Sequence, residues 1–154
     1  MPGEEVLFRE VAQAAAAKTN LVFRGRMSYR DTNDLYGRAK VLVNTSDIEG
    51  FPNSYLQAWI RGVPVVTLID PDRVIERRGL GVAVRSPAQF AEAIRRLLAE
   101  PAAWKAVSDR CRAFMAQEYG EDEVLRPYLE TFDEIMRIDK ASAKITVSSE
   151  ARHV

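Results

Sequence analysis

The chain has 154 residues, 47% of them hydrophobic, with 22 basic and 22 acidic side chains, so it carries no net charge. That length supports one ordinary hydrophobic core and therefore one domain. Because no basic stripe is interleaved with aromatic residues, the sequence argues against nucleic acid as a partner. Cys111 is the only cysteine and His153 the only histidine, which excludes an internal disulfide and a Cys/His zinc cluster, so we expect no metal.

No apolar run reaches the length of about 20 residues that spans a bilayer, and residues 1–6 lack the basic start and apolar core of a signal peptide. A lone cysteine fits a reducing compartment. We therefore expect a soluble, cytoplasmic protein, and this expectation leaves peripheral contact with a membrane open.

The first part of the chain predicts two helices and a strand. Residues 4–18 combine apolar side chains at helical spacing with an alanine run, which predicts a helix that covers a sheet. The short apolar run 21–23 predicts a strand. Ser28, with Asp31 three residues later, is a capping-box pattern that predicts a helix extending to Ala39.

Two apolar, mostly β-branched stretches, 40–44 and 63–68, predict strands joined by a polar loop and a short helix. Asn53 or Ser54 is expected to cap this helix, and Gly62 to end it in the left-handed conformation. Its inner face is expected to consist of Tyr55, Leu56, Trp59 and Ile60. In such a unit the loop lies at the carboxyl end of the first strand, where α/β proteins bind ligands.

The segment after the second strand begins with a turn. Asp70 and Asp72 flank a proline, a pattern that is more typical of turns than of metal sites. A helical turn at 74–77 and a strand at 82–84 are expected next. Helices are then expected from Ser86, from Pro101 and over residues 121–138, the first of them with Phe90, Ile94, Leu97 and Leu98 inward.

The last helices carry two further features. Cys111 falls on an apolar helical row, so we interpret it as an inert packed thiol. The helix over 121–138 has an apolar stripe wider than a local core needs, which indicates a surface for a partner or a second copy. Residues 139–154 predict a flexible tail. The whole pattern predicts an α/β, Rossmann-like three-layer domain over 4–138, with a short parallel sheet of about four strands flanked by helices and a C-terminal helical segment.

The stretch from Glu49 to Val66 resembles the nucleotide-sugar site of retaining glycosyltransferases of family 4, whose two Rossmann-like domains form the arrangement called GT-B. In that family a Glu, a Gly and a Phe precede a helix that carries a second Glu eight positions after the first. The matching residues here are Glu49, Gly50, Phe51, Ala58, Gly62, Pro64, Val65 and Val66. Gln57 stands where the family has the second acid.

The resemblance implies a role for each matching position. Glu49, the first of the family's two acidic residues and the catalytic one, would hydrogen-bond the hydroxyls of the donor sugar. The segment after it would contact the sugar and the diphosphate through Gly50, Phe51, Pro52, Asn53 and Ser54. Gln57 would hold the ribose more weakly than an acid, because an amide keeps an acceptor oxygen but has no charge. No cofactor is implied, since the nucleoside-diphosphate sugar is the donor substrate.

The family's base-binding loop falls at Gly25, Arg26 and Met27, which would contact the nucleobase. Ordinary turn chemistry after a strand is the alternative interpretation of this glycine. Neither the base, the sugar nor the acceptor can be read from these residues.

In complete enzymes of this kind an acceptor domain and two further strand and helix units come first, and residues 1–154 contain none of these. We therefore expect this chain to be incomplete for turnover and to need the missing acceptor domain or another chain. Within its sheet, either strand 21–23 pairs with strand 41–44, which we expect, or another chain completes that edge.

Two functions follow from these observations. The first is the donor-binding portion of a retaining glycosyltransferase, which transfers a sugar from a nucleoside-diphosphate sugar to an acceptor. The second is a non-catalytic α/β module that has kept the fold and binds a partner or self-associates through exposed helices, as a homo-oligomer.

Overall fold

The computed structural model describes the backbone of residues 2–150 and the side chains of residues 5–138. The chain divides into two compact units, Met1–Ala39 and Lys40–Val154, within which the residues contact one another closely. Residues 151–154, the end of the predicted flexible tail, lie outside the described part.

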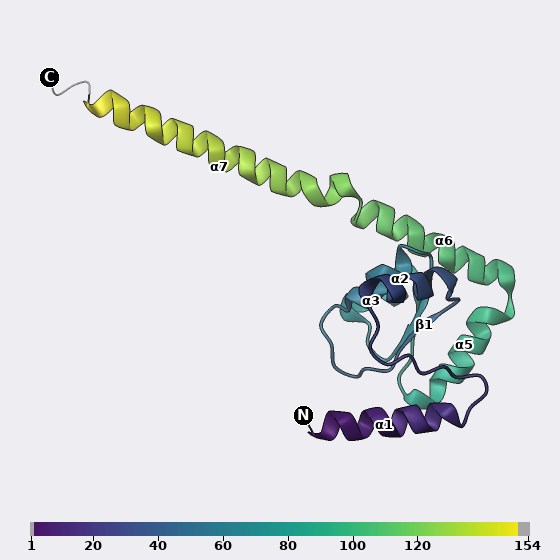
Figure 1. Ribbon diagram of the computed structural model, residues 1–154. Coiled ribbons are helices and arrows are strands. Elements are labelled where there is room, and N and C mark those ends of the chain that lie inside the picture. Colours follow the sequence, from purple (N-terminus) through teal and green to yellow (C-terminus); the bar gives the residue numbers. More distant parts are fainter. Residues whose placement is uncertain (1, 151–154) are drawn as a thin grey trace. The chain divides into compact units, whose positions relative to one another are not determined.

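The first unit contains the two predicted helices, α1 (Pro2–Ala16) and α2 (Tyr29–Arg38) (Figure 1). Val6, Leu7 and Val11 of α1 are at least 44% exposed, so the prediction that this helix covers a sheet is not confirmed. The hydroxyl of Ser28 accepts a hydrogen bond from the Asp31 amide at 3.1 Å and donates one to the Asp31 carboxylate at 2.7 Å, so the predicted cap is confirmed. Residues 21–25 form no strand, and that prediction is wrong. The ring of Phe23 packs edge-on against Phe8 of α1, 4.9 Å between centroids, whereas Leu21 and Val22 are 54% and 68% exposed.

The second unit is built on three parallel strands in the order β1-β2-β3. They are β1 (Leu42–Asn44), β2 (Val65–Thr67) and β3 (Gly81–Ala83), and Val66 lies opposite Val43 and Val82. The fourth strand predicted at 21–23 is absent from this sheet. Among the described strands β1 pairs with β2 alone, so completion of its other edge by another chain stays a prediction.

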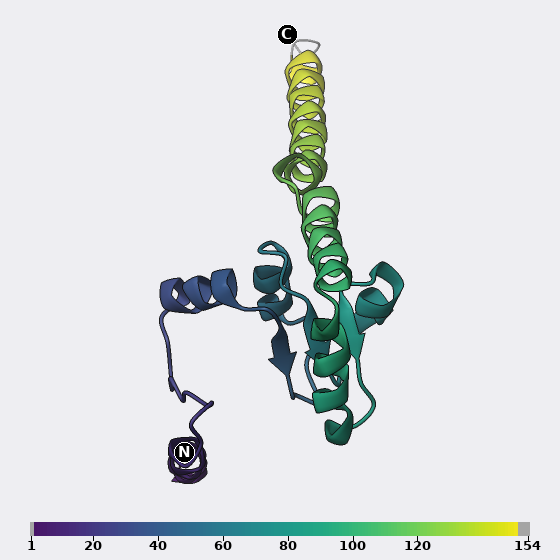
Figure 2. The same cartoon turned by 90° about the vertical axis from the view of Figure 1, so that its right-hand side faces the viewer.

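The central strand β2 is fully buried because helices cover both faces of the sheet. On one face Val66 packs with Val84 and Phe90, and α5 (Phe90–Ala99) covers them. On the other face Thr67 bonds to Tyr55 of α3 (Asn53–Trp59). Figure 2 shows α5 beside the strands. The α/β, Rossmann-like architecture is therefore confirmed, with a smaller sheet than predicted.

Helix α6 (Pro101–Glu118) packs on α3 through Trp59. The Trp59 ring meets the Phe114 ring edge-on at 5.6 Å, and its indole nitrogen donates to the Leu80 carbonyl at 3.3 Å. Arg112 donates to the Arg61 carbonyl at 2.9 Å, where the chain turns away from α3. Gly62 makes this turn at φ 71°, as predicted.

The connection between β2 and β3 contains the 3-10 turn Pro71–Arg73 and α4 (Val74–Arg78). Asp70 caps α4, because its carboxylate accepts from the Ile75 amide at 2.8 Å and the Glu76 amide at 3.0 Å. Strand β3 then begins at Gly81, where a Cβ would lie 1.9 Å from the Val65 carbonyl oxygen. Only glycine fits this position.

A 3-10 turn, Pro87–Gln89, comes before α5. The Ser86 side chain makes no cap bond, and the Gln89 side chain accepts from the Arg85 amide at 2.7 Å instead. Of the predicted inner face, Phe90 is buried and Ile94 is half-buried, whereas Leu98 is 40% exposed and does not belong to it.

Helix α7 (Glu121–Glu150) extends beyond the predicted end at residue 138 (Figure 1). Up to residue 138, where its side chains are described, the large apolar side chains of α7 are at least 41% exposed; they are Val124, Leu125, Tyr128, Leu129, Phe132, Ile135, Met136 and Ile138. Among the described residues, no helix combines the length and the apolar content that crossing a membrane requires.

Candidate functional site

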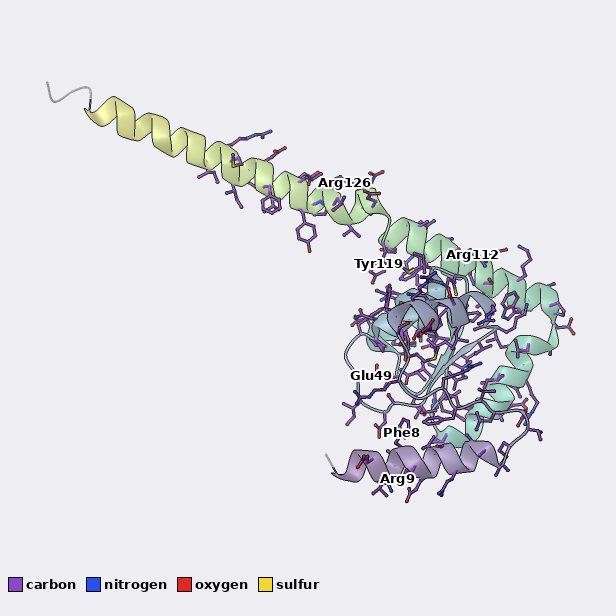
Figure 3. All side chains as sticks on the ribbon, viewed as in Figure 1. Phe8, Arg9, Glu49, Arg112, Tyr119 and Arg126 are labelled. Carbon is purple, nitrogen blue, oxygen red and sulfur yellow. The ribbon has the colours of Figure 1, made fainter. Side chains whose placement is uncertain are left out.

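The loop between β1 and α3 lines an open pocket of about 450 Å³. Glu49 lies on this loop (Figure 3), and the wall also includes residues that follow β2. The lining residues are Glu49, Gly50, Phe51, Ile69, Asp70, Pro71 and Asp72. Because β1 and β2 are parallel, both loops leave the same edge of the sheet, the edge at which α/β proteins bind ligands.

A polar network connects the ends of the two strands to Glu49. The Asn44 amide donates to the Glu49 carboxylate at 3.4 Å and to the Tyr55 hydroxyl at 3.3 Å. The Tyr55 hydroxyl shares a 2.6 Å hydrogen bond with the Thr67 hydroxyl, which accepts from the Ile69 amide at 3.1 Å. Both loops of the pocket are thus fixed by the same buried phenol.

Burial raises the pKa of the Tyr55 phenol above its ordinary value, and the charges of Glu49 and Asp70 raise it further. Hydrogen bonds with Thr67 and Asn44 oppose this shift without cancelling it. Tyr55 is therefore a neutral hydrogen-bonding group at neutral pH. Its role is to position Asn44 and, through it, Glu49.

Helix α3 begins at Asn53, with Pro52 in the extended N-cap position at φ −70° and ψ 122°. The predicted capping by Asn53 or Ser54 is wrong, since both residues are already helical and no side chain caps the helix. Within the described chain, the amides of Gly50, Phe51, Asn53 and Ser54 donate no hydrogen bond. Uncapped amides of this kind are available to an anionic ligand.

Three sets of predicted contact residues are not part of the pocket wall. Pro52, Asn53 and Ser54 follow Phe51 at the start of α3 and do not line the pocket. Gln57 is half-buried on α3, and its carbonyl accepts from Arg61 at 3.1 Å. Gly25, Arg26 and Met27 belong to the first unit. The ribose and nucleobase contacts therefore stay predictions.

The wall of the pocket is acidic. Glu49, Asp70 and Asp72 line it, and its lining includes no lysine or arginine. Asp70 is already engaged in capping α4, whereas Asp72 and its neighbour Arg73 adopt left-handed φ values of 54° and 55°. Such strain is uncommon outside glycine and clusters at functional sites. Within residues 5–138, no group of His, Cys, Asp and Glu side chains has the arrangement of a metal site.

Sequence reasoning did not assign Asn44, Tyr55 or Asp72 to this site. The signal that was present is positional, since Asn44 ends the first strand and Asp72 follows the second. Residues after neighbouring parallel strands meet at one edge of the sheet.

In the comparison with known families, residues 2–100 match the model of the glycosyl transferases of group 1. The chain belongs to the group 1 glycosyltransferases. The matched segment of this group 1 glycosyltransferase begins in α1 and includes all three strands and the Glu49 loop. A search among the curated proteins gave no match. Membership places the chain among proteins that transfer sugars.

Proposed function

We propose that this group 1 glycosyltransferase is the nucleotide-sugar-binding portion of a retaining, family 4-like enzyme. It transfers a sugar from a nucleoside-diphosphate sugar to an acceptor. The observation that carries the proposal is that Glu49 lines an open pocket at the carboxyl edge of a parallel sheet, next to loop amides that no other group engages.

The chemistry of the pocket suits the two halves of such a donor. Carboxylates accept hydrogen bonds from sugar hydroxyls, and Glu49 is oriented for this by Asn44. The amides of Gly50, Phe51, Asn53 and Ser54 donate to the diphosphate, whose negative charge grows as its bond to the sugar breaks. The carboxylate of Glu49 also stabilises the positive charge that develops on the sugar.

These groups supply only part of the catalysis. A rate gain of about 10⁶ requires about 8 kcal/mol of transition-state stabilisation, more than one carboxylate and a few amides provide. The remaining stabilisation comes from a second domain or chain that closes over the donor and completes the site at which the acceptor is positioned. The ribose contact of Gln57 and the nucleobase contacts of Gly25, Arg26 and Met27 remain part of the proposal, supported by the sequence resemblance alone.

Isothermal titration with UDP-glucose, GDP-mannose and ADP-glucose tests this proposal. The Glu49→Gln variant is expected to weaken binding of the preferred donor by about 10- to 100-fold, because it loses a charge-assisted hydrogen bond. Its affinity for the free nucleoside diphosphate should change little. Glu130→Gln, an exposed acid on α7, is the matched control. Failure of all three donors to bind, or unchanged donor affinity in Glu49→Gln, would contradict the proposal.

A second candidate function is favoured by helix α7. We propose, as the alternative, a non-catalytic module that associates with a second copy through the exposed apolar side chains Leu125, Leu129 and Phe132. Light scattering after size exclusion tests it: the wild type should be a dimer and Phe132→Asp a monomer. A wild type that is monomeric at all concentrations rules this function out.

A further inference from the structure

A second pocket of about 400 Å³ adjoins the first and shares two wall residues with it, Phe51 and Asp72. Helix α4 and the end of α6, where Figure 3 labels Tyr119, form the rest of its wall. Its lining residues are Phe51, Asp72, Val74, Arg77, Arg78, Phe114, Glu118 and Tyr119. A ligand in this pocket therefore lies next to any ligand bound at Glu49.

Aromatic rings form one side of the second pocket. The Trp59 ring packs against the rings of Phe51 and Phe114, with centroid distances of 6.1 Å and 5.6 Å. The Phe114 ring packs in turn against the Tyr119 ring, 5.9 Å between centroids. Trp59 is fully buried, whereas Phe51 and Tyr119 are 39% and 40% exposed. The rings of Phe51 and Tyr119 thus each pack against another aromatic ring on one side and are partly open to solvent. This arrangement suits stacking with the ring of a ligand.

Some charged side chains of the second pocket form ion pairs within the protein, and others do not. Arg78 is paired with Glu118 at 2.5 Å and lies 5.6 Å from the centre of the Phe114 ring, so it joins α4 to α6. Arg77 is exposed and forms no hydrogen bond or ion pair with the described residues. Asp72 likewise forms no hydrogen bond with the part of the chain that the structure describes, and it lies in the wall between the pockets. Arg77 is therefore the guanidinium that can take an anionic group of a ligand.

We propose that this second pocket binds a phosphorylated ring compound, with its phosphoryl group on Arg77 and its ring against Phe51 and Tyr119. Guanidinium groups bind phosphate through two parallel hydrogen bonds, which gives both affinity and orientation. The proposal rests on the proposed function in one respect: as a neighbour of the donor pocket, this is the acceptor subsite. The carboxylate of Asp72 accepts a hydrogen bond from a hydroxyl of the acceptor and orients that hydroxyl toward the donor sugar.

Titration calorimetry with glucose 6-phosphate, glucose and inorganic phosphate tests the subsite directly. Glucose 6-phosphate is expected to bind more tightly than either of its parts. Arg77→Gln should weaken its binding by about tenfold or more, the loss expected for a charge-assisted contact. Tyr119→Ala should weaken the binding of glucose 6-phosphate by a smaller factor, because it removes only the aromatic contact with the sugar ring. Arg85→Gln, which removes an exposed arginine that lines neither pocket, should bind like the wild type.

Repeating the titration with UDP, GDP or ADP present identifies the source of the phosphoryl group. If glucose 6-phosphate binds together with the diphosphate and only its own affinity depends on Arg77, the acceptor subsite is supported. If Arg77→Gln instead weakens binding of the nucleoside diphosphate, Arg77 binds a phosphoryl group of the donor and the acceptor assignment is overturned. If no phosphate ligand depends on Arg77, the subsite itself is overturned.

The same data separate this inference from the proposed function. The Glu49→Gln variant tests donor binding alone, because Glu49 does not line the second pocket. A wild type that binds no nucleotide sugar but binds glucose 6-phosphate through Arg77 would keep the subsite and remove its role as acceptor site.

Discussion

Helices α6 and α7 follow one another in the chain and both carry apolar stripes, yet they differ in what covers those stripes. In α6, Cys111, Phe114 and Met115 are at most 8% exposed, because Trp59 of α3 packs against Phe114 and the Leu80 carbonyl lies against the Cys111 thiol. In α7, Leu129 and Phe132 are 62% and 63% exposed. A helical pattern of apolar residues therefore specifies a face, whereas burial depends on a partner surface that the pattern does not contain.

The largest effect is expected for Trp59, which joins α3 to α6. Trp59→Ala should lower the free energy of unfolding by about 3–5 kcal/mol, since it removes a fully buried ring and its bond to Leu80. Phe132→Ala on α7 should change it by less than about 0.5 kcal/mol in the monomer. Urea denaturation measures both, and equal losses would abolish the distinction between the two helices.

Gly81→Ala should be the next most disruptive change. A Cβ there would lie 1.9 Å from the Val65 carbonyl oxygen, so β2 and β3 must separate, at a cost of at least about 2 kcal/mol. Gly50→Ala is the matched control, because nothing lies within 4 Å of a Cβ at that loop position. Thermal melts of both variants test this, and a stable Gly81→Ala would show that the β2–β3 pairing is wrong.

The buried thiol of α6 predicts a pH dependence. Burial raises the pKa of Cys111 to about 12 from an ordinary value of 9.0. Between these values the unfolded chain loses the proton first, so stability falls as pH rises, by at most about 1.4 kcal/mol per pH unit. Urea melts from pH 8 upward should show a shallower decline for Cys111→Ala. Identical pH profiles would mean that Cys111 is accessible to solvent in the folded protein.

Tyr55 is expected to give the smallest of these effects on stability. Tyr55→Phe should cost about 1–2 kcal/mol, because Asn44 and Thr67 both lose a hydrogen-bond partner. Tyr128→Phe, which changes an exposed phenol on α7, should cost nearly nothing. Urea melts of the two variants make the comparison. A Tyr55→Phe variant that is as stable as the wild type would remove the network that fixes the pocket loops.

The sequence was sufficient where local chemistry decides the structure. The Ser28 cap, the left-handed turn at Gly62 and the packed thiol of Cys111 depend on neighbours within one or two turns or on helical spacing. The strand, loop, helix and second strand around Glu49 were readable for the same reason.

Predictions that depend on residues distant in the sequence were less accurate. Residues 21–23 have strand-like composition, but a strand needs a ladder, and Phe23 packs on Phe8 instead. Ile60 lies on the predicted stripe of α3 and is 57% exposed, because the helix ends at Trp59. The role of Tyr55 required knowledge of Thr67, twelve residues away on another element.

The most direct test of the central claim is to follow amide chemical shifts by NMR while the preferred nucleotide sugar is added. The account predicts the largest shifts at Glu49, Gly50, Phe51, Asn53 and Ser54, with smaller shifts at residues 69–72 across the pocket. Shifts concentrated elsewhere in the sheet unit, with these amides unchanged at saturation, would contradict a donor site at Glu49.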